Sequence, residues 1–516
     1  MSGPSHVKAF WQKESCRNGL VLLGCLLLSL LLFANTFGNE WTYDDFPVIV
    51  ENPDVTSIAN FLTDQYPGRP LREMTYLVDY QLFGLRPAGW HLQSCLWHGA
   101  AGFLTFLLMV RLGLGRLAGG VAALLFLVHP VTVEAVANIS HRKESLTLVF
   151  ALLSLLAWRE FCAAAPRRWW WAAGALLCAG VAYLGKQTAV GIPLLWLAME
   201  WVFLPRERWA LLKFWKILGC AGILVAVAGV AWFVKAGGWP MLLAKMQGLL
   251  EFKANYFEAV DFSVYLRMLL KSWTFLLTKL IWPVGLSLEY TFPVPTSWLD
   301  PWVLAGLILV TALGLVLVWS ARRRSPVFFW LVMAIVFFLP VANLVPLAYL
   351  AADRYLYAPW AALAMLVGWL FSRIPGEPRR NLLALAPVCV LLAILTWQQN
   401  RVWFSEQTLW EQAVKVSPES SFVQNNLGNI QYLQGNVAKA FEHYLRAAEL
   451  NPLNATAQFN LGMIWENRGN LALALDYYRK FLLIKSAPFA KDRAALEKRL
   501  LDSYRLRFDG QRFLPR

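Results

Sequence analysis

Long apolar runs are the feature that most constrains this chain. Runs of roughly 18 or more apolar residues recur along the first 400 positions, and each can cross a ~30 Å hydrocarbon core as a helix. A bilayer interior offers no water to backbone N–H and C=O groups, so such runs adopt a structure that pairs these groups internally. Hydrophobic residues make up 58% of the 516 positions, above the roughly 45–50% of soluble domains. We therefore predict an all-α, polytopic membrane protein.

The positions of the runs predict how many helices cross the membrane. Segment 240–283 is apolar but contains Arg267, Lys271 and Lys279, so it forms either a re-entrant or interfacial amphipathic segment or two crossings. The expected total is about 11–13 transmembrane helices. The other expected spans lie near 19–38, 90–110, 118–137, 146–164, 169–185, 187–204, 214–235, 299–320, 327–347, 355–372 and 381–398.

Lysine and arginine residues predict the orientation of these helices. Lys8, Lys13 and Arg17 precede the first run and place the N-terminus in the cytoplasm, because basic loops stay on that side. The first loop, 39–86, is then external, and an odd number of crossings leaves the C-terminus external too. Few N-glycosylation sequons favour a bacterial inner membrane with a periplasmic face; in a eukaryote the equivalent face is the lumen of the endoplasmic reticulum.

Composition excludes several classes of function. The formal net charge is +15, but Lys and Arg lie in short loops between apolar runs rather than in a stripe interleaved with aromatic residues, so no nucleic-acid partner is expected. The seven cysteines lie in or beside apolar runs without a CxxC pair. Neither a disulfide framework nor a zinc site is therefore expected, and membrane lipids are the expected surroundings.

A 34-residue period begins after the last apolar run, near Asn400. The stretch "NNLGNIQYLQGNVAKAFEHYLRAAELNP" is followed by "FNLGMIWENRGNLALALDYYRKFLLIKSAP", with small residues where two antiparallel helices would cross. This is the pattern of tetratricopeptide repeats. The residues expected to shape the repeats are Leu427, Gly428, Ala440, Tyr444, Pro452, Leu461, Gly462, Ala474 and Tyr478.

The period divides the chain into a transmembrane domain over 1–400 and a tetratricopeptide-repeat domain over 401–516. Repeat arrays bind peptide segments in a concave groove, so an acceptor protein or partner is expected there. The alternative is a cap that only stabilises the membrane domain. The expected parts of the second domain are a partial repeat 401–420, repeats at about 421–454 and 455–488 (Ser486 and Pro488 depart from the pattern), and a polar capping helix 489–508.

Ionisable residues gather in the external loops and at the adjoining ends of the runs. Such residues at membrane depth are functional candidates by default. External basic residues run against the orientation rule, and pairing with the phosphate of an anionic lipid head group would explain them. A neighbouring carboxylate would serve as a general base. The candidates are Asp44, Asp45, Arg69, Arg72, His129, Glu134, Arg142, Glu144, Lys186, Asp353, Arg354 and Tyr357.

Several candidates have a purely structural alternative. Asp44 would cap the helix that follows it. His129, which precedes a proline, would be a satisfied interior histidine. Arg142 and Glu144 would form an interfacial ion pair.

Metal binding is left open at two places. His91, His98 and His129 carry suitable ring nitrogens, although their spacing alone is a weak indication. Asp44 and Asp45 would offer carboxylate oxygens to a divalent cation. No certain cofactor is predicted.

Ordered stretches carry a resemblance to a known family: "YDDFPVIVENPDV", "GRPLREMTYLVDYQLFGLRPAGWHLQSCLWH", "HPVTVEAVANISHRKES", "GKQTAVGIPLL" and "ADRYLYAPW", followed by the repeats. This set resembles the transmembrane and tetratricopeptide-repeat-containing protein O-mannosyltransferases. More broadly, it resembles the polytopic C-type glycosyltransferases that use polyprenyl-phosphate sugars. The resemblance covers nearly the whole chain.

The resemblance also implies roles for individual residues. It implies a catalytic acid in the first external loop, for which Asp45 is favoured over Asp44. The family's Lys-Glu pair is Lys186-Gln187 here, and the Glu that precedes its "RYLY" motif is Asp353. The residues implied to meet the donor phosphate are Arg69, Arg142, Lys186 and Arg354.

These observations predict an integral-membrane glycosyltransferase. It would transfer mannose or another hexose from a polyprenyl-phosphate donor to Ser/Thr hydroxyls of exported proteins, with inversion, while the repeats hold the acceptor or a partner. The alternatives are a transferase of the same fold that modifies a glycan or lipid, an O-antigen polymerase or ligase, and a non-catalytic anchor that presents the repeats as a scaffold.

Overall fold

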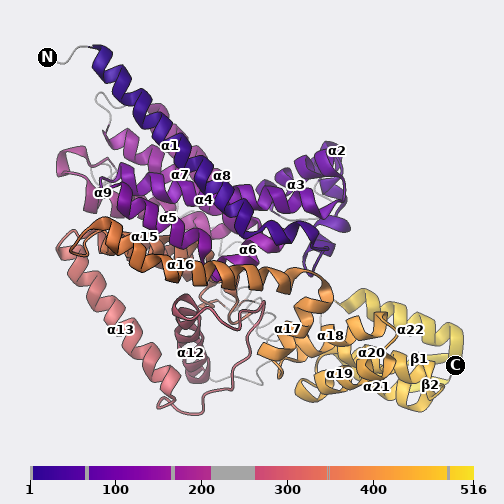
Figure 1. Ribbon diagram of the computed structural model, residues 1–516. Helices are drawn as coiled ribbons and strands as arrows, with labels where there is room; N and C mark the ends of the chain where they lie inside the picture. Colours follow the sequence, from indigo (N-terminus) through magenta and orange to yellow (C-terminus); the bar gives the residue numbers. More distant parts are fainter. Residues whose placement is uncertain are drawn as a thin grey trace, which may run out of the picture. The chain divides into compact units, whose positions relative to one another are not determined.

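The computed structural model describes residues 4–63, 69–163, 169–210, 262–345, 347, 349–484 and 489–515 (Figure 1). These residues are almost entirely helical, as the sequence predicts, with one short C-terminal hairpin. They divide into two compact units. The second unit comprises the chain from Gln407 onward together with Glu289–Val294, and the first comprises nearly all the rest.

The first unit is a bundle of α-helices joined by short 3-10 turns, with one π-helical turn, η2. Its segments, in chain order, are α1 (Pro4–Leu32), η1 (Ala34–Gly38), η2 (Phe46–Val50), η3 (Pro53–Val55), α2 (Ile58–Thr63), α3 (Pro70–Phe83), α4 (Pro87–Arg111), α5 (Arg116–Val128), η4 (Pro130–Thr132), α6 (Val133–Ala137), η5 (Ile139–His141), α7 (Lys143–Ala163), α8 (Trp169–Gly185), η6 (Gln187–Gly191), α9 (Ile192–Phe203), η7 (Arg206–Arg208), α12 (Phe262–Ile281), α13 (Pro301–Arg322), α14 (Pro326–Phe338), η8 (Leu339–Val341), η9 (Asp353–Leu356), α15 (Tyr357–Phe371), α16 (Pro378–Asn400) and η10 (Arg401–Trp403).

Helices occupy all the expected spans that the structure describes. The expected span 214–235 and most of segment 240–283 lie outside the described residues. Within the described part of the chain, two helices bent by 60°, Arg116–Val128 and Pro130–Ala137, are long and apolar enough only as a pair, which forms either a broken span or a re-entrant loop. Five further helices are long and apolar enough to cross a membrane alone: Glu14–Leu32, Pro87–Arg111, Ile139–Ala163, Pro301–Arg322 and Pro378–Trp403.

Several expected spans are short or broken helices because the chain breaks at polar or proline positions. Proline removes a backbone donor and disfavours helix at the residue before it, so α5 stops at Val128, before His129 and Pro130. Helix α8 stops at Gly185, and Lys186 has an extended backbone before η6 begins. These breaks leave ionisable side chains at helix ends, where they can meet across the bundle.

The burial of the apolar helices separates the centre of the bundle from its rim. In α4 and α7, 61% and 67% of the most apolar window is buried, whereas in α1, α13 and α16 the figure is 17%. Helix α4 packs against α1, α5 and α7, and α15 packs on α5 (Figure 1). A Cβ at Gly368 would lie 2.4 Å from the carbonyl oxygen of Ala118, so only glycine permits that crossing.

The first loop, expected to be external, is itself packed on the bundle. A buried cluster joins Ile49 and Val55 of this loop to Tyr76 of α3, Trp90 of α4 and Ile139 of η5. The Tyr76 hydroxyl also donates a hydrogen bond of 2.6 Å to the carbonyl of Ile139. The loop is therefore positioned firmly enough to present side chains to η5.

The second unit consists of helix pairs in the order that the period predicts (Figure 1). Helices α18 and α19 pack together, as do α20 and α21. Asparagine and serine caps start several of these helices; the Asn454 side chain, for example, accepts from the N–H of Ala457. Its segments are α17 (Glu406–Val416, which begins at the last residue of the first unit), α18 (Ser421–Leu433), α19 (Val437–Leu450), α20 (Ala455–Asn467), α21 (Leu471–Leu483), α22 (Ala490–Tyr504), β1 (Leu506–Phe508) and β2 (Phe513–Pro515).

Close packing at glycine confirms the repeat interpretation. A Cβ at Gly428 would lie 2.7 Å from the Tyr444 ring, and one at Gly462 would lie 2.5 Å from the Tyr478 ring. The other predicted helix-crossing residues are buried: Leu427, Ala440, Leu461 and Ala474. Pro452 lies exposed in the turn between α19 and α20.

The end of the repeat region corrects one expectation. The capping helix was expected over 489–508, but α22 ends at Tyr504, and Leu506–Phe508 forms an antiparallel pair with Phe513–Pro515. Asp509 accepts from two backbone N–H groups of the turn, where Gly510 has a positive φ. This turn, not the helical charge pattern, decides the conformation. Ser486 and Pro488 lie outside the described residues.

Candidate active site

Asp45 is the buried carboxylate of the first external loop. Its two oxygens accept the backbone N–H groups of Ser140 at 2.7 Å and Thr42 at 3.2 Å. Burial raises the pKa of the Asp45 carboxyl to about 7 because the charged form loses its hydration, and nearby Asp44 and Glu406 add to the shift against the two hydrogen bonds. Asp45 is completely covered. It therefore ties the loop to η5 and has no exposed surface.

Asp44 presents the accessible carboxylate. Its side chain is 37% exposed, and Oδ2 lies 3.7 Å from Nε2 of buried His141. The preceding Tyr43 has φ of +52°, which costs a residue with a Cβ roughly 1–2 kcal/mol. The Tyr43 N–H donates to the Glu406 carboxylate, and its hydroxyl contacts that of Tyr349. These contacts hold a strained turn that places Asp44 beside His141.

Glu134 lies on the other side of His141. Its Oε1 is 3.7 Å from His141 Nδ1 and pairs with the Arg354 guanidinium, while its Oε2 accepts the Arg354 backbone N–H at 2.7 Å. Glu134 belongs to α6, which follows the Pro130 break, and Arg354 belongs to η9. The break therefore brings a polar row together: Asp44, His141, Glu134 and Arg354.

Two further cations come from the break after α8 and from the start of α3. Lys186 Nζ lies 2.6 Å from Oε1 of Glu144. Arg69 donates from its guanidinium to the carbonyl of Gly185 at 3.2 Å and to Oε1 of Gln187 at 3.1 Å. Lys186 is thus paired with a carboxylate, whereas among the described residues the Arg69 guanidinium donates to neutral oxygens.

Arg72 and Lys143 complete this group of cations. Arg72 donates to the carbonyl of Ser140 at 3.2 Å and lies 3.6 Å from the Glu73 carboxylate. Lys143 is the first residue of α7, and the positive charges of Arg69, Arg72 and Arg354 repel its ammonium. We call the set the cationic cluster; it consists of Arg69, Arg72, Lys143, Lys186 and Arg354.

Known proteins resemble both parts of the chain. A family model described as TPR repeat matches residues 428–469. Protein O-mannosyl-transferase TMTC3 of Mus musculus is 26% identical over 450 residues, covering 79% of this chain and 48% of the relative. Protein O-mannosyl-transferase F38B6.6 of Caenorhabditis elegans is 24% identical over 471 residues, covering 84% and 63%. Protein O-mannosyl-transferase TMTC4 of Homo sapiens is 25% identical over 486 residues, covering 81% and 64%.

The chain is a homologue of the TMTC protein O-mannosyl-transferases. This confirms the family resemblance in the sequence. The chain spans about half the length of the mouse TMTC3 relative. No solved structure matches it at a significant level.

Within this O-mannosyl-transferase homologue, the structure separates some predicted site residues from the cationic cluster. Arg142 is fully buried and pairs with Asp79 at 2.5 Å instead of with Glu144. The His129 ring accepts from the N–H of Val131 and contacts the carbonyl of Leu280, which is the satisfied interior histidine of the structural alternative.

Two predicted residues near η9 also point to other partners. The Tyr357 hydroxyl bonds to Nδ1 of His98 at 2.9 Å in the interior of the bundle. Asp353 is buried, and its negative charge attracts the Lys279 ammonium of α12. Neither contact places these side chains beside Asp44.

His141 and Lys143 are the residues that the sequence-based assignment left out. Both lie in the stretch "HPVTVEAVANISHRKES", so the motif signalled them. Arg142 and Lys143 are adjacent cations, and sequence alone does not tell which of two neighbours turns toward Asp79 and which toward the cluster. In the structure α7 begins at Lys143, and Arg142, the residue before it, is the one that pairs with Asp79.

Among the residues that the structure describes, no three His, Cys, Asp or Glu side chains converge as a metal site. Asp45 is fully covered, so Asp44 is the accessible carboxylate of the acidic pair. The described residues therefore do not fit a divalent metal at the acidic pair, for which several oxygen ligands are needed.

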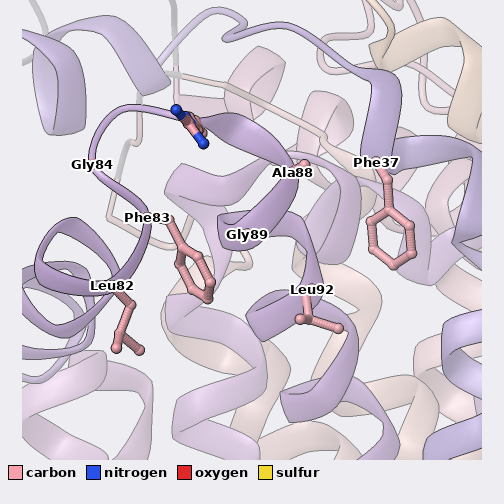
Figure 2. Close-up of a pocket in the computed structure, with 8 residues that line it drawn as sticks. Phe37, Leu82, Phe83, Gly84, Ala88, Gly89 and Leu92 are labelled. Atoms are coloured by element: carbon pink, nitrogen blue, oxygen red, sulfur yellow. The ribbon is translucent and has the colours of Figure 1, made fainter.

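A separate groove of about 740 Å³ lies where α3 meets α4 (Figure 2). Figure 2 shows Phe83, Leu92 and Phe37 around it, and Arg86 contributes its single charge. No residue of the cationic cluster lines this groove. It suits hydrocarbon better than acid–base chemistry.

Proposed function

We propose that this chain transfers a hexose from a polyprenyl-phosphate donor to Ser/Thr hydroxyls of exported proteins. The carrying observation is one accessible carboxylate, Asp44, which lies 3.7 Å from the His141 ring; on the other side of that ring, Glu134 pairs with Arg354 of the cationic cluster. Glycosyl transfer from a lipid phosphate with inversion needs a proton acceptor on one face of the sugar and a phosphate stabiliser on the opposite face. The relatives named protein O-mannosyl-transferases favour mannose as the hexose and a protein as the acceptor.

The chemistry assigns a role to each side of the site. Asp44 takes the proton of the acceptor hydroxyl while its oxygen attacks the anomeric carbon. The bond from that carbon to the phosphate oxygen breaks on the opposite face, so the configuration inverts. The electron pair goes to the phosphate, where Arg and Lys side chains stabilise the growing charge.

This proposal places the base at Asp44 and makes Asp45 a positioning residue. Asp45 has no exposed surface, and each of its oxygens already accepts one backbone N–H group. Asp45 instead holds the loop against Ser140, and the adjacent Asp44 gains its position beside His141.

Sidedness and the role of the repeats belong to the same proposal. By the orientation rule, the site and the repeats lie on the external face: periplasmic in a bacterium, luminal in the endoplasmic reticulum of a eukaryote. The repeat region would bind the acceptor or a partner, as repeat arrays of this kind do. We propose the domain boundary near residue 400, where the last apolar helix ends.

The test compares exported proteins by intact mass. The strains are a deletion of this gene and the deletion complemented with wild type, Asp44→Asn, Asp45→Asn or Glu51→Gln. Glu51 is an exposed carboxylate in the same loop and is the matched control. All variants are first shown to reach the membrane at equal levels.

We expect a hexose-sized mass increment to disappear in the deletion and to return with wild type and Glu51→Gln. With Asp44→Asn, transfer in isolated membranes falls about 100-fold or more, as for loss of a general base. Full activity of Asp44→Asn together with an inactive, well-folded Asp45→Asn would return the base to Asp45. If both variants restore every modification, the scaffold alternative replaces the enzyme.

A further inference from the structure

The segment that joins the last apolar helix to the repeats runs along the first loop. Asn400, at the end of α16, donates from its side chain to the carbonyl of Leu32 at 2.9 Å. Further along, the Glu40 N–H donates to the carbonyl of Phe404 at 2.9 Å. All four residues belong to the first unit. These contacts align the joining segment with the residues that lead to the acidic pair.

This segment ends at Glu406, which holds the turn before Asp44. The Glu406 carboxylate accepts the N–H of Tyr43, the residue whose φ is +52°. A left-handed backbone at a residue with a Cβ persists only where the surrounding contacts impose it. The Glu406 carboxylate is such a contact, so the position of Asp44 depends on the position of Glu406.

Glu406 is also the first residue of α17, which from Gln407 onward belongs to the second unit. Within that unit, the buried Trp410 ring packs edge-on against Phe422 of α18, with the ring centroids 5.6 Å apart. The side chain of Gln434, which follows α18, donates to Oε1 of Gln407 at 2.9 Å. Helix α18 therefore fixes the helix whose first residue holds the turn before the base.

We propose that Glu406 couples the repeat region to the base. An acceptor polypeptide bound in the repeats shifts α17, and the shift of Glu406 moves Tyr43 and with it Asp44. This inference rests on the proposed function. Coupling between distant sites needs an element that both of them bias. Helix α17 is that element, because it packs on α18 along its length and contacts the first loop at its first residue.

The experiment perturbs each end of this connection in the full-length protein. Phe422→Ala loosens α17 at α18, Glu406→Ala removes the contact with Tyr43, and a third variant combines both changes. The matched control is Glu411→Ala, since this carboxylate lies on the same helix and accepts from Gln407. Transfer is measured in isolated membranes at equal protein levels, with exported proteins of the deletion strain as acceptor. Hydrogen exchange of the Tyr43 amide is followed in detergent.

We expect Glu406→Ala to lower kcat about 10–100-fold with little change in KM, because a small displacement of a catalytic group is enough for such a loss. Phe422→Ala also lowers kcat, and Gln434→Ala, the milder change at the same helix contact, acts in the same direction. In the Glu406→Ala background, Phe422→Ala has no further effect, since the connection is already broken. The Tyr43 amide exchanges faster in both single variants. Glu406→Gln keeps an oxygen for this amide and recovers part of the loss, and Glu411→Ala matches wild type.

Additive losses of kcat from Glu406→Ala and Phe422→Ala would overturn the coupling. So would unchanged exchange of the Tyr43 amide in Phe422→Ala. Wild-type transfer by Glu406→Ala beside an inactive Asp44→Asn would leave the proposed base in place and refute the role of Glu406. If Asp44→Asn keeps full transfer, the proposed base fails and the coupling fails with it.

Discussion

The repeat region is built from contacts between residues that are close in the sequence, whereas the polar site is built from contacts between residues that are far apart in it. In the repeats, Gly428 meets Tyr444 and Gly462 meets Tyr478, at the same spacing each time. In the site, Asp45 reaches Ser140, 95 residues away, and Glu134 reaches Arg354, 220 residues away. A repeated local contact leaves a period in the sequence, whereas a single long-range ion pair leaves none.

The two regions also differ in what their ion pairs contribute. Arg142 and Asp79 are both fully covered, whereas Arg446 and Glu449 of α19 pair at 3.5 Å with half of each side chain exposed. Water and salt screen the exposed pair, so it contributes little. If one partner of the buried pair is removed, no water can reach the other partner to solvate its charge. The same kind of contact is therefore structural in the bundle and nearly neutral in the repeats.

The largest expected effect is loss of the buried Arg142. Arg142→Met leaves Asp79 as an uncompensated buried charge and should destabilise the protein by about 3–5 kcal/mol. Thermal unfolding in detergent and the monodisperse yield measure it. Arg446→Met, the matched change in the repeats, should cost at most about 1 kcal/mol. The double change Arg142→Met with Asp79→Leu should recover part of the loss; if it does not, packing rather than charge dominates at this position.

A smaller effect is expected at the repeat crossing. Gly462→Ala forces the Tyr478 ring aside because the new Cβ would lie 2.5 Å from it. Overpacking of this kind costs about 1–3 kcal/mol, which outweighs the gain of roughly 1 kcal/mol in helix propensity.

Hydrogen exchange of the full chain locates the change at Gly462. We expect faster exchange in α20 and α21 only. Gly174→Ala in α8 is the control, since nothing lies within 4 Å of its Cβ position. Unchanged exchange in the repeats of Gly462→Ala would mean that this crossing is looser than its geometry indicates.

The smallest expected effect, counted per pH unit, is the pH dependence of stability that Asp45 causes. The carboxyl has a pKa of about 7 when folded, raised by burial from 3.8. Between these values, the folded state keeps a proton that the unfolded chain releases, so stability falls as pH rises. The slope is at most about 1.4 kcal/mol per pH unit, and it vanishes above pH ~7. Asp45→Asn should remove it; a slope that persists in this variant would belong to another group.

The helical elements were predictable because their signals are local. Apolar length predicted α1, α4, α7, α13 and α16, and the 34-residue period predicted α18 to α21. The capping helix was predicted too long because a turn at Asp509 and Gly510 outweighs charge pattern. Side chains from several of the predicted polar stretches lie near one another, as Asp44, His141 and Glu134 do. The pairings inside them were not predictable, since they depend on which face each short helix turns.

By itself, the sequence determined that this chain is an all-α membrane protein with a repeat tail. Apolar length and the 34-residue period are properties of each segment by itself and can be seen without knowing what packs against it. The sequence also determined which stretches carry ionisable groups. Tertiary structure alone decided that Asp45 is covered and Asp44 accessible, and that Arg142 has a counterion while Lys143 has no ion pair among the described residues. The reason is physical: the environment of a charge depends on the distant elements packed around it, and adjacent residues on a turn or helix end face different neighbours.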